Sequence, residues 1–389
     1  MAFTFGNLSR RSKRAAARLA LAAGLLALVV SHAPASADTV EPIHVFKGAH
    51  HGGVMPQGAL LQASDGKLWG ATSEGGEGND GIIFRIALDG TYESVTGVPL
   101  WQGRNFVGDL VQTEDGTLWA VTTYGGDYDA GSILAVGLDG AISLVYSFNP
   151  AGWGGHPNGG LLKASDGKLY GVIPEDTELR LPGAVYRLDP ATRGWTIVAT
   201  LPSDCVYYDG GRLVEGSDGA FYGVRRGQGG CIFRVTPRGT AKVIHKYSKG
   251  NRFPQDIVAA SDGNLYITFD EWLSRNRDCS GVARMTLSGK STTINIFPCP
   301  NGQAYPQAGI MQDSHGMLRG SLSHLNDAGN AYVVTTWKMA LDGTSFSETR
   351  VRPRSGQYMQ RLTEASDGNF YTTAAGGKYG EGTIVKVSP

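Results

Sequence analysis

The chain has 389 residues, with 35 basic and 35 acidic side chains, and 41% of its residues are hydrophobic. Five of the basic residues and none of the acidic ones lie in the first 37 positions, which leaves 30 basic against 35 acidic side chains, a net charge of −5. This balance argues against a nucleic-acid partner, whose binding needs a basic footprint. No apolar stretch after position 37 is long enough to be a membrane span.

The first 37 residues have the pattern of an export signal. A basic stretch precedes an apolar run from Leu19 to Val30, which is too short to span a bilayer comfortably. Small residues ending at Ala37 form a cleavage site. We therefore expect residues 1–37 to be a signal peptide cleaved near Ala37, and residues 38–389 to be a secreted or periplasmic domain.

One phrase then returns seven times at a period near fifty residues. It begins with a small or polar residue followed by Asp-Gly. Two further residues, an aromatic residue and then small residues follow. Its Asp position is held by Asp65, Asp115, Asp166, Asp218, Asp262, His315 and Asp367. An apolar residue stands five positions earlier, and an aromatic stands four positions later in every repeat except the sixth, which has Arg319. This periodicity is typical of repeat architectures.

Each repeat contains four short apolar runs bounded by Gly, Asp or Asn, which predicts strands joined by hairpins. Four antiparallel strands per unit are typical of a propeller blade. The last repeat ends after its third run, GTIVKVSP, and the mature chain starts with EPIHVFKG, which has the character of a fourth strand. We predict an all-β, seven-bladed β-propeller whose N-terminal strand completes the last blade; an open solenoid is the alternative.

The repeats resemble the GloVer-type tandem repeat. The resemblance rests on Pro, an apolar pair, Asp-Gly, Leu-Tyr-Gly, a Gly-Gly loop, Gly-apolar-Phe and a second Asp-Gly, best matched in the first, second and seventh units. It implies a propeller and an extracytoplasmic location, and it implies no established chemistry. A more distant similarity connects the Asp-Gly-x-Leu-Trp phrases to streptogramin-lyase propellers, and the predicted architecture is shared with several polysaccharide lyases.

In a propeller, the loops before each first strand surround one mouth of the central channel, where ligands commonly bind. The position ten residues before the Asp position is held by Met55, Asn105, His156, Tyr208, Arg252, Tyr305 and Gln357. Equivalent positions on successive blades lie on an arc, so we expect these side chains to converge on one ligand. The alternative is that exposed loop residues are polar and aromatic without any role in binding.

His, Tyr and Arg together suit β-elimination on a uronate. We expect His156 to act as base, Tyr208 as acid or second base, and Arg252 to neutralise the carboxylate. The residues expected to shape the substrate subsites are His51, Arg104, Asn105, Trp153, Tyr207, Tyr305 and Gln357.

The function that follows is a polysaccharide lyase acting on an extracellular, acidic polysaccharide or oligosaccharide, as a monomer and without a cofactor. Two alternatives remain open. One is a non-catalytic propeller that binds a glycan or a protein on the same face. The other is a lyase for a small cyclic ester, like the streptogramin enzymes.

Four cysteines in an exported chain suggest disulfides. Cys205–Cys231 and Cys279–Cys299 each stay within one blade, although pairings that cross between the fourth and fifth blades are also possible. We expect no metal site, because zinc-type ligand spacings are absent and the loop GGEGND lacks the ligand spacing of a calcium loop. Arg319 should be paired, exposed or stacked on an aromatic such as Tyr266.

Overall fold

The structure is a computed structural model, and it describes residues 38–48, 52–176, 180–203, 210–226, 230–247, 252–274, 277–299, 304–306, 309–325, 332–352 and 357–389. Residues Asp38–Pro389 form one compact unit. The predicted signal peptide, residues 1–37, lies outside the described residues.

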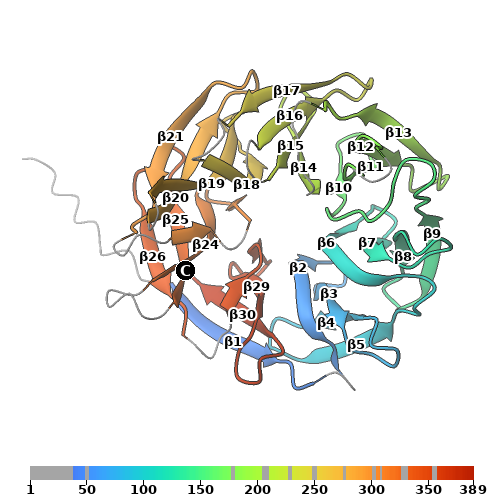
Figure 1. Cartoon of the computed structure of the whole chain (residues 1–389). Coiled ribbons are helices and arrows are strands. Elements are labelled where there is room, and N and C mark those ends of the chain that lie inside the picture. Colours follow the sequence, from blue (N-terminus) through green and yellow to red (C-terminus); the bar gives the residue numbers. More distant parts are fainter. Residues whose placement is uncertain are drawn as a thin grey trace, which may run out of the picture. The chain divides into compact units, whose positions relative to one another are not determined.

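Seven antiparallel sheets follow one another around a ring (Figure 1). Blade 1 contains β2 (Val54–Gln62), β3 (Leu68–Glu74), β4 (Ile82–Ile86) and β5 (Tyr92–Gly97). Blade 2 contains β6 (Arg104–Gln112), β7 (Leu118–Tyr124), β8 (Ser132–Val136) and β9 (Ile142–Ser147). Blade 3 contains β10 (Leu162–Lys163), β11 (Leu169–Ile173), β12 (Ala184–Leu188) and β13 (Trp195–Thr200).

The remaining blades repeat this order. Blade 4 contains β14 (Gly210–Glu215), β15 (Phe221–Arg225), β16 (Cys231–Val235) and β17 (Ala241–Lys246). Blade 5 contains β18 (Arg252–Ala259), β19 (Leu265–Ser274), β20 (Arg277–Met285) and β21 (Ser291–Ile296). Blade 6 contains β22 (Ala304–Pro306), β23 (Met311–Gln312), β24 (Leu318–Leu325), β25 (Tyr332–Met339) and β26 (Ser347–Arg350). Blade 7 contains β27 (Gln357–Met359), β28 (Thr363–Glu364), β29 (Phe370–Ala375), β30 (Thr383–Ser388) and β1 (Thr39–Val45).

Blade 7 combines the two ends of the domain. The N-terminal strand β1 pairs antiparallel with β30, the last strand of the chain, from Thr39 opposite Ser388 to Val45 opposite Thr383. The predicted seven-bladed propeller, closed by its N-terminal strand, is therefore confirmed. β1 supplies hydrogen-bond partners to the backbone groups along the outer edge of β30, which would otherwise be unpaired.

The repeated Asp caps the turn between the first and second strands and also fixes the following aromatic residue. In blade 1, the backbone N–H of Lys67 donates to the Asp65 carboxylate over 3.1 Å, and the Trp69 indole N–H donates to the same carboxylate over 3.1 Å. In blade 3, the Tyr170 hydroxyl donates to Asp166 over 2.8 Å. Burial, together with this bond, raises the pKa of Tyr170 to about 12. The Asp-to-aromatic spacing thus reflects one local hydrogen-bonded unit.

Neighbouring turns are joined by a second repeated contact. A Gln or Glu three residues before the Asp position accepts a hydrogen bond from the backbone N–H just before the Asp of the preceding blade. Gln112 accepts from Ser64 over 2.8 Å, which joins blade 2 to blade 1. Gln62 accepts from Ser366 over 2.8 Å, which joins blade 1 to blade 7 and so spans the closure of the ring.

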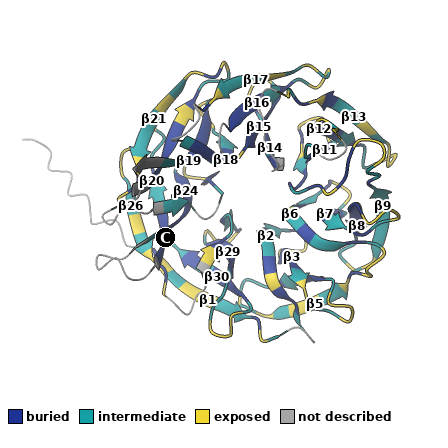
Figure 2. Cartoon of the chain, in the orientation of Figure 1, coloured by how far each residue is buried: buried dark blue, intermediate teal, exposed yellow. Residues whose placement is uncertain are grey.

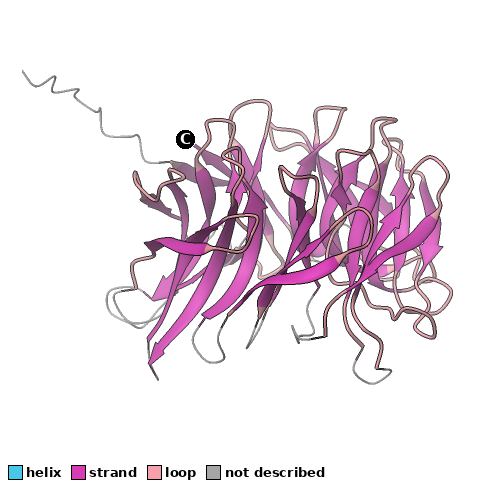
Figure 3. Cartoon of the chain, turned by 90° about the horizontal axis from the view of Figure 1, so that it is seen from above, coloured by secondary structure: helices cyan, strands magenta, loops and turns pink. Residues whose placement is uncertain are grey.

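The apolar cores lie between adjacent blades. Trp69 and Ile83 of blade 1, for example, are in one buried cluster with Phe106 and Leu134 of blade 2. The outermost strands are only partly covered, as Figure 2 shows for β5 and β13. Strands run between two faces rich in loops, as the view in Figure 3 shows.

Arg319 occupies the aromatic position of blade 6 because it joins blades 6 and 7. Its guanidinium donates to Asp313 over 2.6 Å and to Asp38 over 3.0 Å, and its side chain is only 7% exposed. It lies 4.1 Å from the ring centre of Phe370 in blade 7, and not on Tyr266 as suggested from the sequence. Asp38 also accepts from Lys338 over 2.6 Å. Two carboxylates therefore compensate the buried arginine.

We expect Asp38→Asn to lower the free energy of unfolding by about 3 kcal/mol, because removing one partner of a buried ion pair leaves the other charges poorly compensated. Urea-induced unfolding of the purified protein measures this. Asp139→Asn is the matched control, because Asp139 is exposed and its turn-capping oxygen is retained in Asn. Equal unfolding midpoints for the two variants would contradict the assignment.

His44 of β1 stacks on Tyr92 of blade 1 with ring centres 4.0 Å apart. Burial, followed by the charge of Lys47, lowers the pKa of His44 from 6.5 to about 4. The unfolded chain therefore binds the proton more readily between these pH values. The contribution of neutral His44 to stability is thus complete above pH 6.5 and declines as the pH falls toward 4.

We expect His44→Gln to lose less thermal stability than wild type between pH 7 and pH 4.5. His315→Gln, at an exposed turn, should keep the wild-type difference.

Candidate functional site

One face of the ring carries the loops that enter each first strand and the loops between second and third strands. We call it the mouth face. The Asp-Gly turns lie on the opposite face, because each first strand crosses from one face to the other. The predicted site residues that the structure describes belong to mouth-face segments.

The predicted column shares an unusual backbone conformation in the first three blades. Met55, Asn105 and His156 have φ angles of 55°, 58° and 54°, in the left-handed region. Few residues other than Gly adopt this conformation, with Asn and His enriched among them. The three positions are thus equivalent in backbone conformation, as the repeat predicts.

Blade 5 departs from this equivalence by one residue. Arg252 pairs across from Glu271, as Arg104 of blade 2 pairs across from Tyr124. Arg252 is therefore equivalent to Arg104 and not to His156. The physical reason is the bulge in the first strand, which contains one residue fewer in blade 5 than in blades 1 and 2.

Arg252 is already bound within its own blade. Its guanidinium donates to Glu271 and to the Thr293 hydroxyl, each over 2.9 Å, and lies 4.5 Å from the ring centre of Phe269. Within the described part of the chain, no hydrogen bond or ion pair joins it to His156.

His156 belongs instead to a cluster at the boundary between blades 2 and 3. The Tyr124 ring lies 4.9 Å from the His156 ring, and the Arg104 guanidinium lies 4.6 Å from the centre of the Tyr124 ring. Arg104 also donates to Asp129 over 2.9 Å. The backbone N–H of Gly125, with the Arg104 charge contributing, lowers the pKa of Asp129. Histidine, tyrosine and arginine are therefore brought together here, although the tyrosine is not one that the sequence analysis selected.

The hydrogen bonding of His156 defines which ring nitrogen is available. Its Nδ1 lies 3.1 Å from the carbonyl oxygen of Thr123. A carbonyl can only accept, so Nδ1 carries the hydrogen, and the Nε2 of the neutral ring has a free lone pair. The His156 side chain is exposed. Nε2 is thus placed to accept a proton from a molecule on the mouth face.

A groove of about 470 Å³ adjoins this cluster between blades 1 and 2. Arg104, Asn105 and Tyr124 line one side, and Glu74 and Asp80 contribute carboxylates. The predicted subsite residues Arg104 and Asn105 therefore share a concave surface next to His156.

The other predicted subsite residues are distributed as follows. Trp153 is 41% exposed, three residues before His156 in the same loop. Tyr305 lies in β22 and is partly buried. Gln357 begins β27, and its neighbour Tyr358 has the left-handed backbone, with φ 51°. His51, Tyr207 and Tyr208 lie outside the described residues.

Exposed apolar side chains also gather on the mouth face. Large hydrophobic residues that are more than a third exposed occur, within the described ranges, in its loops or at the strand ends beside them. They are Met55, Leu100, Trp101, Tyr128, Trp153, Ile296, Tyr358 and Tyr379. Trp101, Tyr128 and Trp153 belong to three loops around blade 2, close in sequence to the Arg104–Tyr124–His156 cluster. Aromatic faces of this kind suit contact with sugar rings.

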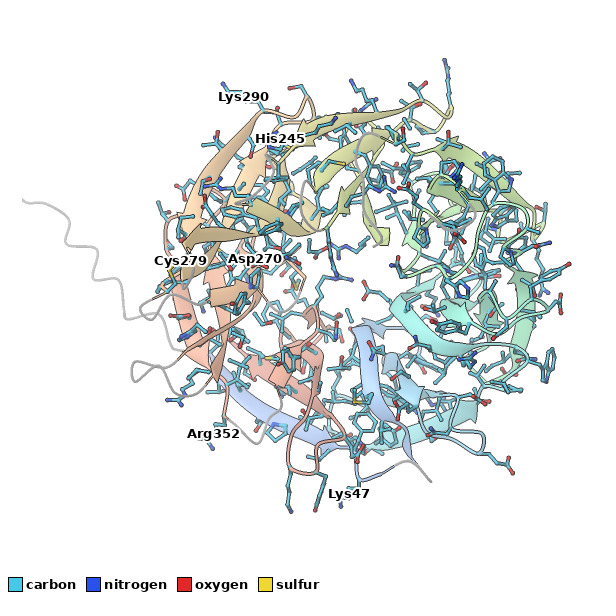
Figure 4. The ribbon with its side chains drawn as sticks, viewed as in Figure 1. Lys47, His245, Asp270, Cys279, Lys290 and Arg352 are labelled. Atoms are coloured by element: carbon cyan, nitrogen blue, oxygen red, sulfur yellow. A yellow bond between two sulfur atoms is a disulfide. The ribbon has the colours of Figure 1, made fainter. Side chains whose placement is uncertain are left out.

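The centre of the ring contains a second polar site. A cavity of about 330 Å³ is lined by residues from all seven blades. Figure 4 shows side chains extending from the inner strands into the central opening. Its charged lining residues are Asp109, Arg212, Arg226, Asp256 and Arg361.

Four of these charges occupy one column of the repeat, six residues before the Asp position. The column reads Ala59, Asp109, Gly160, Arg212, Asp256, Gly309 and Arg361. Arg361 donates to Asp109, and Arg212 lies 3.7 Å from Asp256. Burial opposes ionisation of Asp109, but Arg361 and Arg212 lower the pKa of its carboxyl. None of these residues is among the predicted site residues, although charged residues next to a buried Leu or Ile are a readable signal.

The mouth face is also crosslinked. Cys279 and Cys299 form a disulfide with a Cα–Cα distance of 5.7 Å, which confirms that expected pairing. Cys279 on β20 pairs across from Glu271 on β19, and Figure 4 labels Cys279 and Asp270, the residue before Glu271. Cys231 is disulfide-bonded as well, and Cys205 lies outside the described residues.

Two further observations concern the described ranges only. No group of three or more His, Cys, Asp or Glu side chains there is arranged to hold a metal ion. No helix there has the length and apolarity needed to cross a membrane.

In blades 6 and 7 the first strand is divided into two segments, β22–β23 and β27–β28, which pair with the same second strand. The ring of seven four-stranded blades makes this protein a seven-bladed β-propeller. The chain belongs to the Gloeobacter/Verrucomicrobia repeat family, whose model matches residues 28–231. This confirms the resemblance inferred from the Asp-Gly repeats. No curated protein matches the chain significantly.

The chain is also similar to solved structures of low sequence identity. A polysaccharide lyase, an ulvan lyase bound to -[GlcA(1-4)Rha3S]-, is 10% identical with a TM-score of 0.57, over 87% of this chain and 94% of its own. A protein of unknown function from Dyadobacter fermentans is 12% identical with a TM-score of 0.49, over 90% and 97%. A gluconolactonase from Xanthomonas campestris is 12% identical with a TM-score of 0.44, over 90% and 89%.

The packing around the axis leads to a stability prediction. Gly58 and Gly66 both have positive φ angles, of 68° and 78°. A Cβ at Gly58 would overlap the carbonyl oxygen of Gly108 in the next blade, whereas a Cβ at Gly66 would meet nothing within 4 Å. Gly66→Ala should therefore cost only the backbone strain, about 1 kcal/mol, and Gly58→Ala about 2 kcal/mol more. Urea unfolding of both variants measures the difference, and equal costs would contradict close contact between the inner strands.

Proposed function

We propose that the protein is an exported propeller that binds an acidic polysaccharide across its mouth face and cleaves it by β-elimination without a metal. The observation that carries this proposal is the exposed His156, whose Nδ1 donates to Thr123 and whose Nε2 is left free beside Tyr124. A base held in one tautomer, next to a tyrosine and an arginine, suits proton abstraction from an acidic sugar.

In this reaction the base removes the proton α to the uronate carboxylate, the C4–O4 bond breaks, and a C4=C5 double bond forms. The electron pair of the broken bond leaves with O4, which takes up a proton. We assign the first proton transfer to Nε2 of His156 and the second to the hydroxyl of Tyr124, with the sequence-predicted Tyr208 as the other candidate. The developing charge on the carboxylate needs a nearby cation.

Arg104 is our first candidate for that cation, because it lies over Tyr124 in the same cluster. Arg252, which the sequence analysis selected for this role, remains the second candidate, since its guanidinium is engaged by Glu271 and Thr293. Each arginine already has one carboxylate partner, so substrate binding would have to share or displace it.

Export is part of the proposal. We propose that residues 1–37 are removed near Ala37 and that the mature domain works outside the cytoplasm, as a monomer. The Cys279–Cys299 disulfide supports an oxidising compartment.

The test is incubation of the purified protein with uronate polysaccharides while the ultraviolet absorbance of new unsaturated ends is recorded. His156→Asn removes the base and keeps a residue that tolerates the left-handed backbone. We expect it to reduce the initial rate by about 100-fold or more. Tyr124→Phe should also lower the rate, and a chelator should have no effect.

His315→Asn is the matched control, because His315 is exposed on the opposite face, at an Asp-Gly turn position. It should retain the wild-type rate. Full activity in both His156→Asn and Tyr124→Phe would remove the residue assignment, and loss of activity with a chelator would contradict metal-free chemistry.

A non-catalytic glycan-binding propeller is the second candidate function. It is favoured by the exposed aromatic rings of Trp101, Tyr128 and Trp153 on adjoining loops, which are 62%, 56% and 41% exposed. Binding of a polysaccharide that forms no unsaturated product, and that weakens when Trp101 is replaced by Ala, would select this function over the lyase.

A further inference from the structure

The axial cavity has properties that closure of the ring does not require. Seven side chains of ordinary size in the column six residues before the Asp position would fill the centre of the ring. Three of the seven positions are instead held by small residues, Ala59, Gly160 and Gly309. A Cβ at Gly309 would meet the Asp256 carboxylate and the Arg361 side chain. Small residues on some blades thus make room for long charged side chains from others, and a cavity of about 330 Å³ remains.

The lining of this cavity holds more hydrogen-bond donors than its own acceptors can use. Each guanidinium has five N–H groups. In the described part of the chain, Arg226 donates only from Nε, to the Gln255 carbonyl over 2.7 Å, and Arg361 donates only to Asp109. Arg212 donates to the carbonyls of Ile257 and Ile310, and its buried Nε has no hydrogen-bond partner among the residues that the structure describes.

The charges of the lining also favour a ligand that accepts hydrogen bonds. Three arginines face two aspartates in the lining, so the cavity has a positive balance within a domain of net negative charge. Surplus N–H donors and a surplus positive charge favour an oxyanion, which arginine binds with paired hydrogen bonds.

The position of the cavity connects it to the mouth face. Gln57 in β2 precedes the column residue Ala59, and Gln360, between β27 and β28, precedes Arg361. Arg226 follows the end of β15, so the lining extends from the column toward the mouth. Its volume is at the low end of the roughly 300–1,000 Å³ found for small-molecule sites, and a single sugar residue suits it better than a length of polymer.

We propose that the axial cavity is a binding site for one acidic sugar residue, whose carboxylate or sulfate group is held by Arg226 and Arg212 while its hydroxyls contact the amides of Gln57 and Gln360. This proposal adds a ligand site to the proposed function. It rests on that function only for the inference that the ligand is a sugar. It also supplies a second anion-binding site, in addition to the mouth-face arginines Arg104 and Arg252, each of which already has a carboxylate partner.

The test is isothermal titration calorimetry of the whole protein at low ionic strength with glucuronate, glucose 6-sulfate and glucose. We expect at least one of the two anionic sugars to bind and glucose to bind about tenfold more weakly or not at all. The stronger of the two anionic sugars then identifies the anionic group as carboxylate or sulfate. No binding of either anionic sugar, or equal binding of all three sugars, would overturn the proposal.

Arg226→Gln is the informative variant, because Arg226 is exposed and its substitution leaves the buried ion pairs intact. We expect it to weaken binding about tenfold or more. Arg238→Gln is the matched control, an exposed arginine in the turn between β16 and β17 on the opposite face, and it should stay within about twofold of wild type. Equal losses in the two variants would refute a specific site. Thermal unfolding checks that both variants fold.

His156→Asn separates this inference from the proposed function. If both are correct, this variant forms no unsaturated product and still binds the acidic sugar. Sugar binding lost in Arg226→Gln, with no product from any polysaccharide in wild type, would support the cavity and reject the lyase. Product formation by wild type without sugar binding would reject the cavity alone.

Discussion

Pairing of β1 with β30 is the contact on which the rest of the structure depends. It converts a linear row of repeats into a ring, and the Gln62–Ser366 and Arg319–Asp38 contacts hold the same region by side chains. A ring has an axis, and only around an axis do equivalent positions of different blades face one another. Both the axial cavity and the mouth-face cluster exist because this closure is made.

The two polar sites divide the available charges between them. On the mouth face, Arg104 and Arg252 are each held by a carboxylate, and His156 presents Nε2 as a hydrogen-bond acceptor. On the axis, Arg226 and Arg361 keep N–H donors that no group in the described ranges accepts from. A ligand that reaches from one site to the other would have its anionic group bound at the centre and would contact a proton acceptor nearer the rim. This separation connects the proposed lyase chemistry with the proposed acidic-sugar site.

Much of the fold was predictable, and part of the site was not. The Asp65–Trp69 and Asp166–Tyr170 bonds are local, so they recur with the sequence and reveal the blade. His156 and Arg104 lie on the mouth face, as the repeat predicts. Tyr124 was missed, because its contact with His156 crosses from one blade to the next. Arg252 was assigned to the wrong column, because the bulge in its strand is one residue shorter than in blades 1 and 2.

The sequence by itself determined the number of blades, the strand order within each blade and the closure by the N-terminal strand. These follow from local turn chemistry and from the period of the repeat, which are properties of neighbouring residues. Only the tertiary structure decided which charges share the axis, that Arg319 stacks on Phe370 and that Tyr124 meets His156. Those contacts depend on how side chains from separate blades fill the space between them, and the local sequence does not record that geometry.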